Sequence, residues 1–228
     1  RLIIISNRLP FSVERQNGDV VARQSSGGLV SAIKSYIETS KGHHHYTDKV
    51  WVGSMDANES DWNDAKEAGL LPDDFYMKPI FADNSTYKNF YNGFSNSSLW
   101  PLFHYFPSLV EFRKDYFEDY KKINQLFADT ILEIYEPGDI VWVHDYQLMM
   151  LPDMLRRILP DATIGFFLHI PFPSYEILRL LPTDLKKQLI QGRMGAELIC
   201  FHTHDYGQHF IQSAKIIMQV ESQFNTVY

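Results

Sequence analysis

Polar side chains that can bind protons, hydroxyl groups or phosphates follow several apolar runs of this sequence. His144, Asp145 and Tyr146 follow "IVWV", His169 follows "GFFL", and Arg8 follows "LIIISN". A carboxylate and an imidazole can orient hydroxyl groups and stabilise developing charge, and an arginine can hold a phosphate. If the runs are parallel strands, ligands should bind where their carboxyl ends meet. We therefore expect Arg8, Asp145 and His169 to converge at one edge of a sheet.

A single histidine at a strand end is more often a satisfied structural group than a catalytic one. Further polar residues, however, follow two more predicted strands, with Ser54 after "WVG" and both His202 and His204 after "LICF". Packing alone does not require such residues at so many strand ends. Pro171 and Pro173 would also end the strand before His169 and hold the next loop open. The pattern favours a ligand site over a structural role.

Two glycines, Gly27 and Gly28 in "SSGGL", begin a predicted helix soon after the first strand. Glycine lets the backbone approach a phosphate closely, and a helix N-terminus offers free N–H groups. Gly-Gly also serves ordinary tight turns. Its position after the first strand, where nucleotide-binding folds hold phosphates, favours the phosphate interpretation.

Residues 91–105, "YNGFSNSSLWPLFHY", combine aromatic and amide side chains in what we predict to be a loop. Flat rings and short polar side chains are suited to holding a sugar, which makes Asn92, Asn96 and Trp100 candidates. An aromatic core patch is the alternative for the apolar members, Phe94, Leu102 and Phe103.

The elements that must position these residues alternate between strands and helices. Apolar and β-branched runs predict strands over 1–6, 49–55, 139–148, 162–170 and 196–202, and helical spacing predicts helices over 27–40, 108–135, 148–159, part of 174–194, and 205–218. Asn17-Gly18 predicts a hairpin turn. The alternation predicts an α/β fold with a doubly wound, Rossmann-like parallel sheet. We expect this domain to span 1–218, with 219–228 a truncated connection toward a missing C-terminal domain.

Composition limits the classes of partner. The net charge is −7 and no Lys/Arg run exceeds a pair, so a nucleic-acid-binding footprint is missing. Neither a membrane-length apolar run nor a signal peptide is visible, and a single cysteine excludes an internal disulfide, so we expect a cytoplasmic protein without a membrane partner. Paired cysteines and "HExxH" are missing, and His43, His44 and His45 are consecutive, so we expect no metal and no cofactor.

Six ordered blocks together resemble the N-terminal half of trehalose-6-phosphate synthases, which are retaining glycosyltransferases of the GT-B type. They are "SNRLP", "SSGGL", "YNGFSNSSLWPLFHY", "VHDYQLMMLP", "GFFLHIPFPS" and "GAELICFHTHDYGQHF". The resemblance implies glucosyl transfer from a nucleotide-glucose to glucose 6-phosphate, and UDP-glucose is the donor that we expect. The product would be trehalose 6-phosphate.

The resemblance also implies a role for each matching residue on the acceptor side. Arg8 would bind the phosphate of glucose 6-phosphate, Tyr91 and Trp100 would line its pocket, and Asp145 would bind its hydroxyl groups. Retention in such enzymes is usually explained without a protein nucleophile. Asp145 would then orient the substrates and stabilise charge.

On the donor side, Gly27 and Gly28 would lie against the diphosphate and His169 would bind hydroxyl groups of the transferred sugar. Asp145 and His169 together would form the transfer centre. The family's second, donor-binding half has no counterpart in this sequence. We therefore expect these 228 residues alone to be inactive.

One departure from the family pattern leaves alternatives open. The family usually has Trp-x-Gly-Trp at the second strand, whereas "WVGS" places Ser54 at the last position. A non-catalytic, synthase-like regulatory domain of a trehalose phosphatase or bifunctional protein would fit this change, as would a transferase with another phosphorylated acceptor. A phosphatase domain or partner, or a homo-oligomer, is compatible with either alternative.

Overall fold

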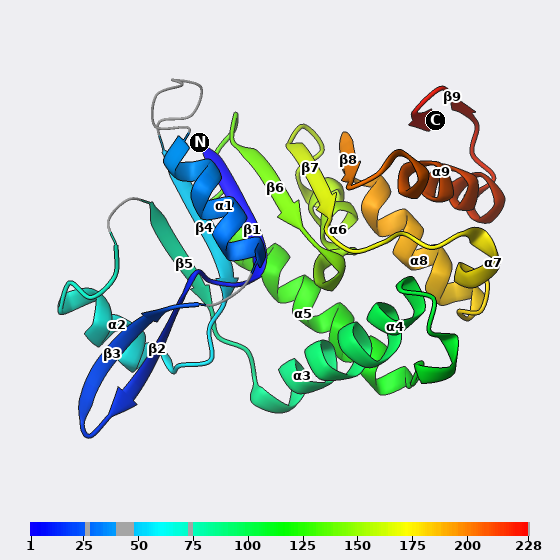
Figure 1. Ribbon diagram of the computed structural model, residues 1–228. Helices are drawn as coiled ribbons and strands as arrows, with labels where there is room; N and C mark the ends of the chain where they lie inside the picture. The colour runs from blue at the N-terminus through cyan, green and yellow to red at the C-terminus, as the bar shows by residue number, and fades with distance from the viewer. Residues whose placement is uncertain (26–27, 40–47, 73–74, 228) are drawn as a thin grey trace. The chain divides into compact units, whose positions relative to one another are not determined.

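The computed structural model describes residues 1–25, 28–39, 48–72 and 75–227. The chain divides into two compact units, Arg1–Ala82 and Asp83–Tyr228 (Figure 1). In each unit, parallel strands alternate with helices, so the predicted parallel α/β class is confirmed. Gly27 and the three consecutive histidines lie outside the described residues.

The first unit contains the parallel strands β5 (Tyr76–Ile80), β4 (Lys49–Ser54) and β1 (Leu2–Arg8), which lie side by side in that order. Ile3 pairs with Val50 and Ile5 with Val52, and these four side chains are buried, as expected for strands covered on both faces. A hairpin of β2 (Phe11–Gln16) and β3 (Asp19–Gln24) turns at Asn17 and Gly18. Both residues have positive φ, as the predicted Asn-Gly turn requires.

The elements of the first unit follow each other along the chain as β1 Leu2–Arg8, β2 Phe11–Gln16, β3 Asp19–Gln24, α1 Gly28–Thr39, β4 Lys49–Ser54, α2 Glu59–Glu67 and β5 Tyr76–Ile80.

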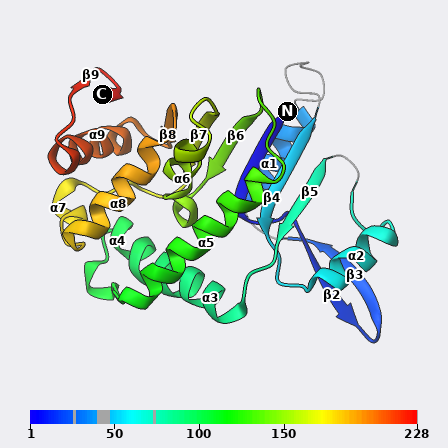
Figure 2. The same cartoon turned by 180° about the vertical axis from the view of Figure 1, so that it is seen from behind.

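The second unit contains the parallel strands β6 (Ile140–His144), β7 (Thr163–Leu168) and β8 (Leu198–Phe201). His144 pairs with Phe167, and Leu168 pairs with Phe201, so the three strands end side by side (Figure 1). Helix α6 (Leu151–Ile158) packs against β7 and lies between α5 (Lys114–Leu132) and α8 (Thr183–Met194), which Figure 2 shows from behind.

The remaining elements of the second unit are α3 Asn84–Lys88, the π-helix η2 Asn89–Leu99, α4 Trp100–Phe103, η3 Pro107–Leu109, α5 Lys114–Leu132, η4 Tyr146–Leu148, α6 Leu151–Ile158, α7 Tyr175–Leu178, α8 Thr183–Met194, α9 His204–Met218, β9 Ser222–Gln223 and β10 Thr226–Val227.

The predicted loop over residues 91–105 is wrong, because most of this segment is helical. The π-helix η2 runs directly into α4, and Phe90, Phe94, Leu99 and Phe103 are fully buried. Their spacings of four, five and four residues match a π-helical repeat, which hydrogen-bonds from i to i+5. The core-patch alternative is therefore confirmed for Phe94, Leu102 and Phe103.

Helix α5 supplies the surface on which η2 packs. The Phe94 ring lies 4.7 Å from the Tyr120 ring and 5.0 Å from the Phe117 ring, measured between centroids. A Cβ at Gly93 would lie 2.7 Å from the ring of Tyr116, so glycine is needed for this close approach. The predicted helix over 108–135 is shorter than expected, since it begins at Lys114 after the 3₁₀ turn η3.

Candidate functional site

Asp145 follows the last residue of β6 in an unusual backbone conformation. Its φ of 77° and ψ of 172° lie in a region that is essentially restricted to glycine. Its backbone N–H donates to the Phe167 carbonyl at 2.8 Å, which extends the contact between β6 and β7 by one residue. Such strain persists only when neighbouring contacts hold it, and it concentrates at functional sites.

The Asp145 side chain is held by two backbone N–H groups. Tyr146 donates to Oδ1 at 2.9 Å and His169 donates to the same oxygen at 3.1 Å. Asp145 is 8% exposed, and burial raises the pKa of its carboxyl group to about 6, although the two N–H groups act in the opposite direction. The carboxylate that forms above this pH is fixed through Oδ1, so Oδ2 is the oxygen left to meet a ligand.

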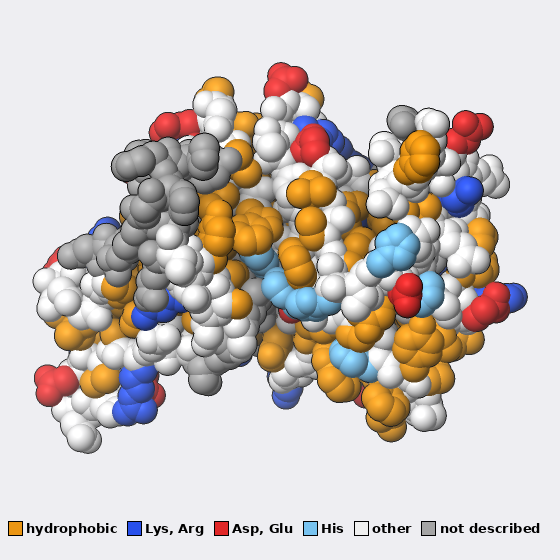
Figure 3. All heavy atoms as spheres, turned by 45° about the horizontal axis from the view of Figure 1, so that its top comes forward, with side chains coloured by type: hydrophobic (Ala, Val, Ile, Leu, Met, Phe, Trp, Pro, Cys, Tyr) orange, Lys and Arg blue, Asp and Glu red, His pale blue; other side chains and the backbone are white. Residues whose placement is uncertain are grey.

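His169 lies directly after β7, beside Asp145 and His144. Its Nε2 is 2.9 Å from Nδ1 of His144, and its ring stacks at 4.4 Å from the Phe167 ring. Burial lowers the pKa of His169 to about 4, with the neighbouring His202 adding to the effect. His169 is therefore neutral near pH 7 and acts as a hydrogen-bonding group there. Figure 3 shows histidine side chains reaching the surface close to one another on one face.

The segment η2 contacts the Asp145 turn through one side-chain hydrogen bond. The hydroxyl group of Tyr146 donates to Oδ1 of Asn96 at 2.8 Å, which connects η2 to the residue after Asp145. Tyr91 is half-buried in η2 and stacks at 6.0 Å on Tyr87. π-Helical segments are rare and often occur at functional sites.

Trp100 begins α4 and is 41% exposed, the ring lying 4.0 Å from the ring of His104. An exposed indole that is immobilised by stacking can offer its free face to a sugar. Helix α4 packs against η2 and α7. The second unit therefore contains Tyr91, Trp100, Asp145 and His169, and it brings Asp145 and His169 into direct contact.

The first unit contains Arg8, Ser54 and Gly28. Arg8 ends β1 opposite Ser54, and its guanidinium pairs with the carboxylate of Asp56 at 2.9 Å on the surface. Gly53 permits this arrangement, since a Cβ there would lie 2.7 Å from the carbonyl carbon of Arg8. Convergence of these residues with Asp145 and His169 stays a prediction.

Ser54 and Gly28 differ in what surrounds them. Ser54 is buried, and its hydroxyl group donates to the Asn7 carbonyl at 2.5 Å, so this residue joins β4 to the end of β1. Gly28 begins α1, and a Cβ at this position would meet no described atom within 4 Å. Gly28 is exposed, and the described residues leave the space beside it open.

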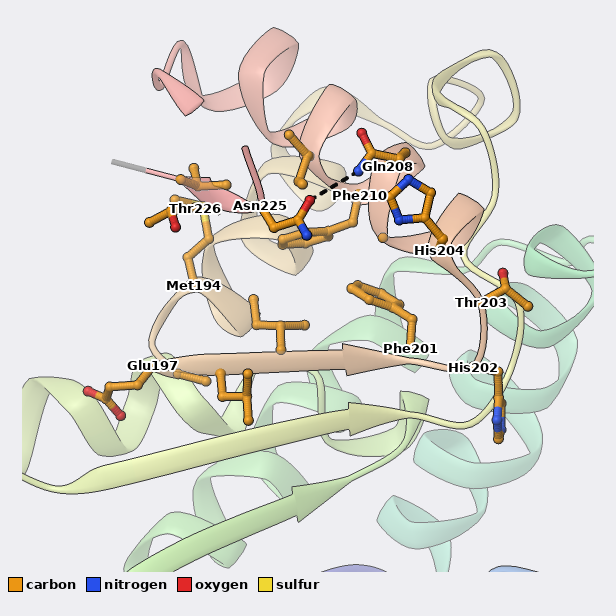
Figure 4. A pocket seen from close by; sticks show the side chains of 16 residues that line it. Met194, Glu197, Phe201, His202, Thr203, His204, Gln208, Phe210, Asn225 and Thr226 are labelled. Atoms are coloured by element: carbon orange, nitrogen blue, oxygen red, sulfur yellow. Dashed lines mark hydrogen bonds between the residues drawn. The ribbon is translucent and has the colours of Figure 1, made fainter. Parts of the chain in front are cut away.

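A pocket of about 550 Å³ lies elsewhere in the second unit, between β8, α9 and β10 (Figure 4). Phe201 points into it, and Gln208 donates to Asn225 across it at 3.3 Å. Of the strand-end residues named from the sequence, His202 and His204 line this pocket, whereas Asp145 and His169 do not. We therefore place the candidate site at the ends of β6 and β7, where strain, burial and polar contacts coincide.

Sequence reasoning named His144 as a strand-end residue but gave it no role. The structure places it at the centre of the site, 1% exposed, with the Trp142 ring 4.3 Å away and a hydrogen bond to His169. The alternation of side chains along "WVH" was the available signal, since it puts Trp142 and His144 on one face of β6.

Among the described residues, no group of three or more His, Cys, Asp or Glu is placed to hold a metal ion, and none of the helices has the length and apolar character of a membrane span.

Comparison with known proteins gives a match over nearly the whole sequence. The model of glycosyltransferase family 20 matches residues 1–227. The UDP-forming alpha,alpha-trehalose-phosphate synthase A of Dictyostelium discoideum is 42% identical over 231 residues, covering 100% of this chain and 30% of that protein. The corresponding enzyme of Yarrowia lipolytica is 41% identical and covers 100% of this chain and 48% of that protein. The chain thus spans less than half the length of these relatives.

Solved structures match over the same extent. An E. coli structure described as bound with UDP-2-fluoro glucose has a TM-score of 0.76 and 27% identity, covering 100% of this chain and 46% of that one. The N-terminal domain of Candida albicans trehalose-6-phosphate phosphatase has a TM-score of 0.77 and 28% identity, covering 100% and 45%. These matches confirm the predicted doubly wound, Rossmann-like fold of the GT-B N-terminal half.

Proposed function

The chain belongs to glycosyltransferase family 20, and on this basis we propose that the full-length protein transfers glucose from UDP-glucose to glucose 6-phosphate, giving trehalose 6-phosphate. The observation that carries the proposal is the contact between Asp145 and His169 at the adjoining ends of β6 and β7. A strained backbone and a buried carboxylate beside a neutral imidazole do not stabilise the fold, so stability alone does not explain this arrangement. The arrangement suits the orientation of sugar hydroxyl groups.

Asp145 would bind an acceptor hydroxyl group through Oδ2. Its Oδ1 already accepts two backbone N–H groups, so the carboxylate is fixed before a substrate arrives and needs little reorganisation. Above its pKa of about 6, it would bring a negative charge close to the positive charge that develops on the transferred sugar. His169 would bind a hydroxyl group of that sugar as a neutral partner.

Arg8, Tyr91 and Trp100 would bind glucose 6-phosphate. The guanidinium of Arg8 can form a bidentate contact with a phosphate, although the ligand must share or displace the carboxylate of Asp56. The exposed, stacked ring of Trp100 and the half-buried ring of Tyr91 would cover the sugar.

The donor diphosphate would lie at the N-terminus of α1, against Gly27 and Gly28. The open space at Gly28 supports this assignment, since free N–H groups and the helix dipole favour an anion there. The donor-binding half would follow 219–228 and complete the site, so we propose that residues 1–228 alone are inactive. We also propose that the protein is cytoplasmic and acts on these small molecules without nucleic acid or membrane.

A second candidate is a synthase-like domain without catalytic activity in a trehalose phosphatase. The similarity to the phosphatase N-terminal domain and the presence of Ser54 favour it. The retained Asp145–His169 contact favours the synthase, because a regulatory domain has no chemical need for it. A transferase acting on a different phosphorylated acceptor would keep that contact as well.

Turnover by the full-length protein separates these candidates. Purified protein is incubated with UDP-glucose and glucose 6-phosphate, and UDP and trehalose 6-phosphate are measured. We expect formation of both by the wild type and loss of both in Asp145→Ala. UDP release only with another sugar phosphate would identify a different acceptor, and no transfer to any sugar phosphate would favour the regulatory domain.

A further inference from the structure

His144 contacts the candidate site but has no part in the proposed binding of substrates. It is the last residue of β6 and is 1% exposed. Its Nδ1 lies 2.9 Å from Nε2 of His169, whereas its own Nε2 is fully buried and has no hydrogen-bond partner among the described residues. The two imidazoles thus form a pair with one shared hydrogen bond and one orphaned nitrogen.

A hydrogen bond between two neutral imidazoles has two arrangements. In one, His144 carries its proton on Nδ1 and donates to His169, which leaves a bare lone pair at the buried Nε2. In the other, His169 donates and His144 carries its proton on Nε2, which leaves an orphaned N–H in the interior. Orphaned buried N–H groups are rarer in proteins than under-satisfied acceptors, so the first arrangement is favoured.

Both rings are neutral near pH 7. Burial lowers the pKa of His144 to about 3, with His169 adding to the effect, and the pKa of His169 is lowered to about 4. His202 faces His169 edge-on, with the ring centroids 5.6 Å apart and no hydrogen bond between the two side chains, and the Asp145 carboxylate accepts the backbone N–H of His169. The shared hydrogen bond with His144 therefore remains the main influence on the tautomer of His169.

We propose that His144 is a positioning residue that donates from Nδ1 to His169 Nε2 and thereby fixes the proton of His169 on Nδ1. His169 then presents an N–H donor to its ligand, and its lone pair is already engaged. This inference rests on the proposed function only in assigning that ligand as a sugar. The substrate atom that meets His169 must act as an acceptor, such as a hydroxyl oxygen.

Side-chain ¹⁵N NMR of the ligand-free, full-length protein tests the tautomers directly. The protein is labelled with ¹⁵N-histidine, and the two signals are assigned with His169→Gln and His144→Phe. We expect protonated Nδ1 in both residues at pH 7.5. A protonated Nε2 in His169 of the wild type would overturn the proposal, and the His169 signal that decides this is assigned with His169→Gln alone.

Three variants separate positioning from packing. His144→Phe keeps a ring beside Trp142 but removes the donor, so the His169 proton should redistribute toward Nε2. His202→Phe is the matched control, because it changes the other neighbouring imidazole and should leave the tautomer unchanged. His144→Asn can place an N–H near the same position and should restore the wild-type tautomer at least in part. An unchanged tautomer in His144→Phe would contradict the proposal.

Kinetics then show whether the tautomer matters for transfer. In the full-length protein we expect kcat to fall on the order of 10- to 100-fold in His144→Phe, by analogy with the partners that orient metal-bound histidines. His144→Asn should recover most of that loss. If no transfer occurs in the wild type while His169 carries its proton on Nδ1, the proposed function fails and the positioning role stands. If transfer occurs and kcat is unchanged in His144→Phe, the fixed tautomer has no role in it.

Discussion

Replacing Asp145 by asparagine should stabilise the protein near neutral pH while it abolishes transfer. Both backbone N–H groups that hold the side chain donate to Oδ1, so an asparagine oxygen can accept the same two bonds. Only the charge is then removed. The comparison isolates the free energy of keeping a buried carboxylate ionised.

The magnitude follows from the raised pKa. The carboxyl pKa is about 6 in the folded protein against 3.8 as the reference value, so the folded state binds this proton more tightly. Below pH 3.8 the carboxyl group is protonated in both the folded and the unfolded protein, so the tighter proton binding of the folded state contributes its full stabilisation there. As the pH rises through 6 that contribution is lost, and the difference of about two pKa units corresponds to roughly 3 kcal/mol. Asp145→Asn should therefore be more stable than the wild type by up to about 3 kcal/mol above pH 6.5.

Chemical denaturation of wild type and variant between pH 3.5 and 8 measures this difference. It should be near zero at the acid end, increase by about 1.4 kcal/mol per pH unit between 3.8 and 6, and then level off. Asp129→Asn, at an exposed aspartate of α5, is the control and should show no comparable change. A pH-independent difference, or destabilisation by Asp145→Asn at pH 8, would refute the assignment of Asp145 as a buried, destabilising carboxylate.

Four further substitutions test the packing and binding arguments. Gly192→Ala should lower the free energy of unfolding by about 1–3 kcal/mol, because the added Cβ would collide with the Met149 carbonyl oxygen. Gly207→Ala, in α9, meets no such collision and should raise the free energy of unfolding by up to about 1 kcal/mol. Equal effects of the two substitutions in chemical denaturation would contradict this packing argument. Tyr120→Phe should cost about 1–3 kcal/mol in the same assay, because its buried hydroxyl group satisfies one backbone carbonyl and one backbone N–H; a neutral effect would show that these groups find other partners. Arg8→Ala in the full-length protein should weaken glucose 6-phosphate binding by about 1.5–3 kcal/mol and change UDP-glucose binding far less, and equal losses in calorimetric titration would show that Arg8 is structural.

The strand-end residues could be predicted because their signals are local. Each strand is a continuous apolar run, and polar residues follow directly. The parallel register of β6 and β7 then brings Asp145 to the backbone of His169. The convergence of these two residues depends on β6 and β7 being neighbours, which the βαβ pattern indicates, and on their register, which the structure supplies.

Other features have no local signal. The π-helix has apolar spacings of four and five residues, which differ from the 3.6-residue repeat of an α-helix. Helix α2 buries only Trp62 and Ala65, and β5 contains Lys78 and Pro79, so neither has a strong apolar period. The positive φ of Asp145 could not be predicted either, because aspartate, unlike glycine, does not mark such a conformation.

The central claim is that the contact between Asp145 and His169 belongs to a glucosyl-transfer site. A product assay of the full-length protein with UDP-glucose and glucose 6-phosphate, comparing wild type with Asp145→Asn, tests it most directly. We predict that the wild type forms UDP and trehalose 6-phosphate in equal amounts and that the variant, though at least as stable, forms neither at a comparable rate. Wild-type protein that binds both substrates without transfer, or a variant that transfers at the wild-type rate, would contradict the account.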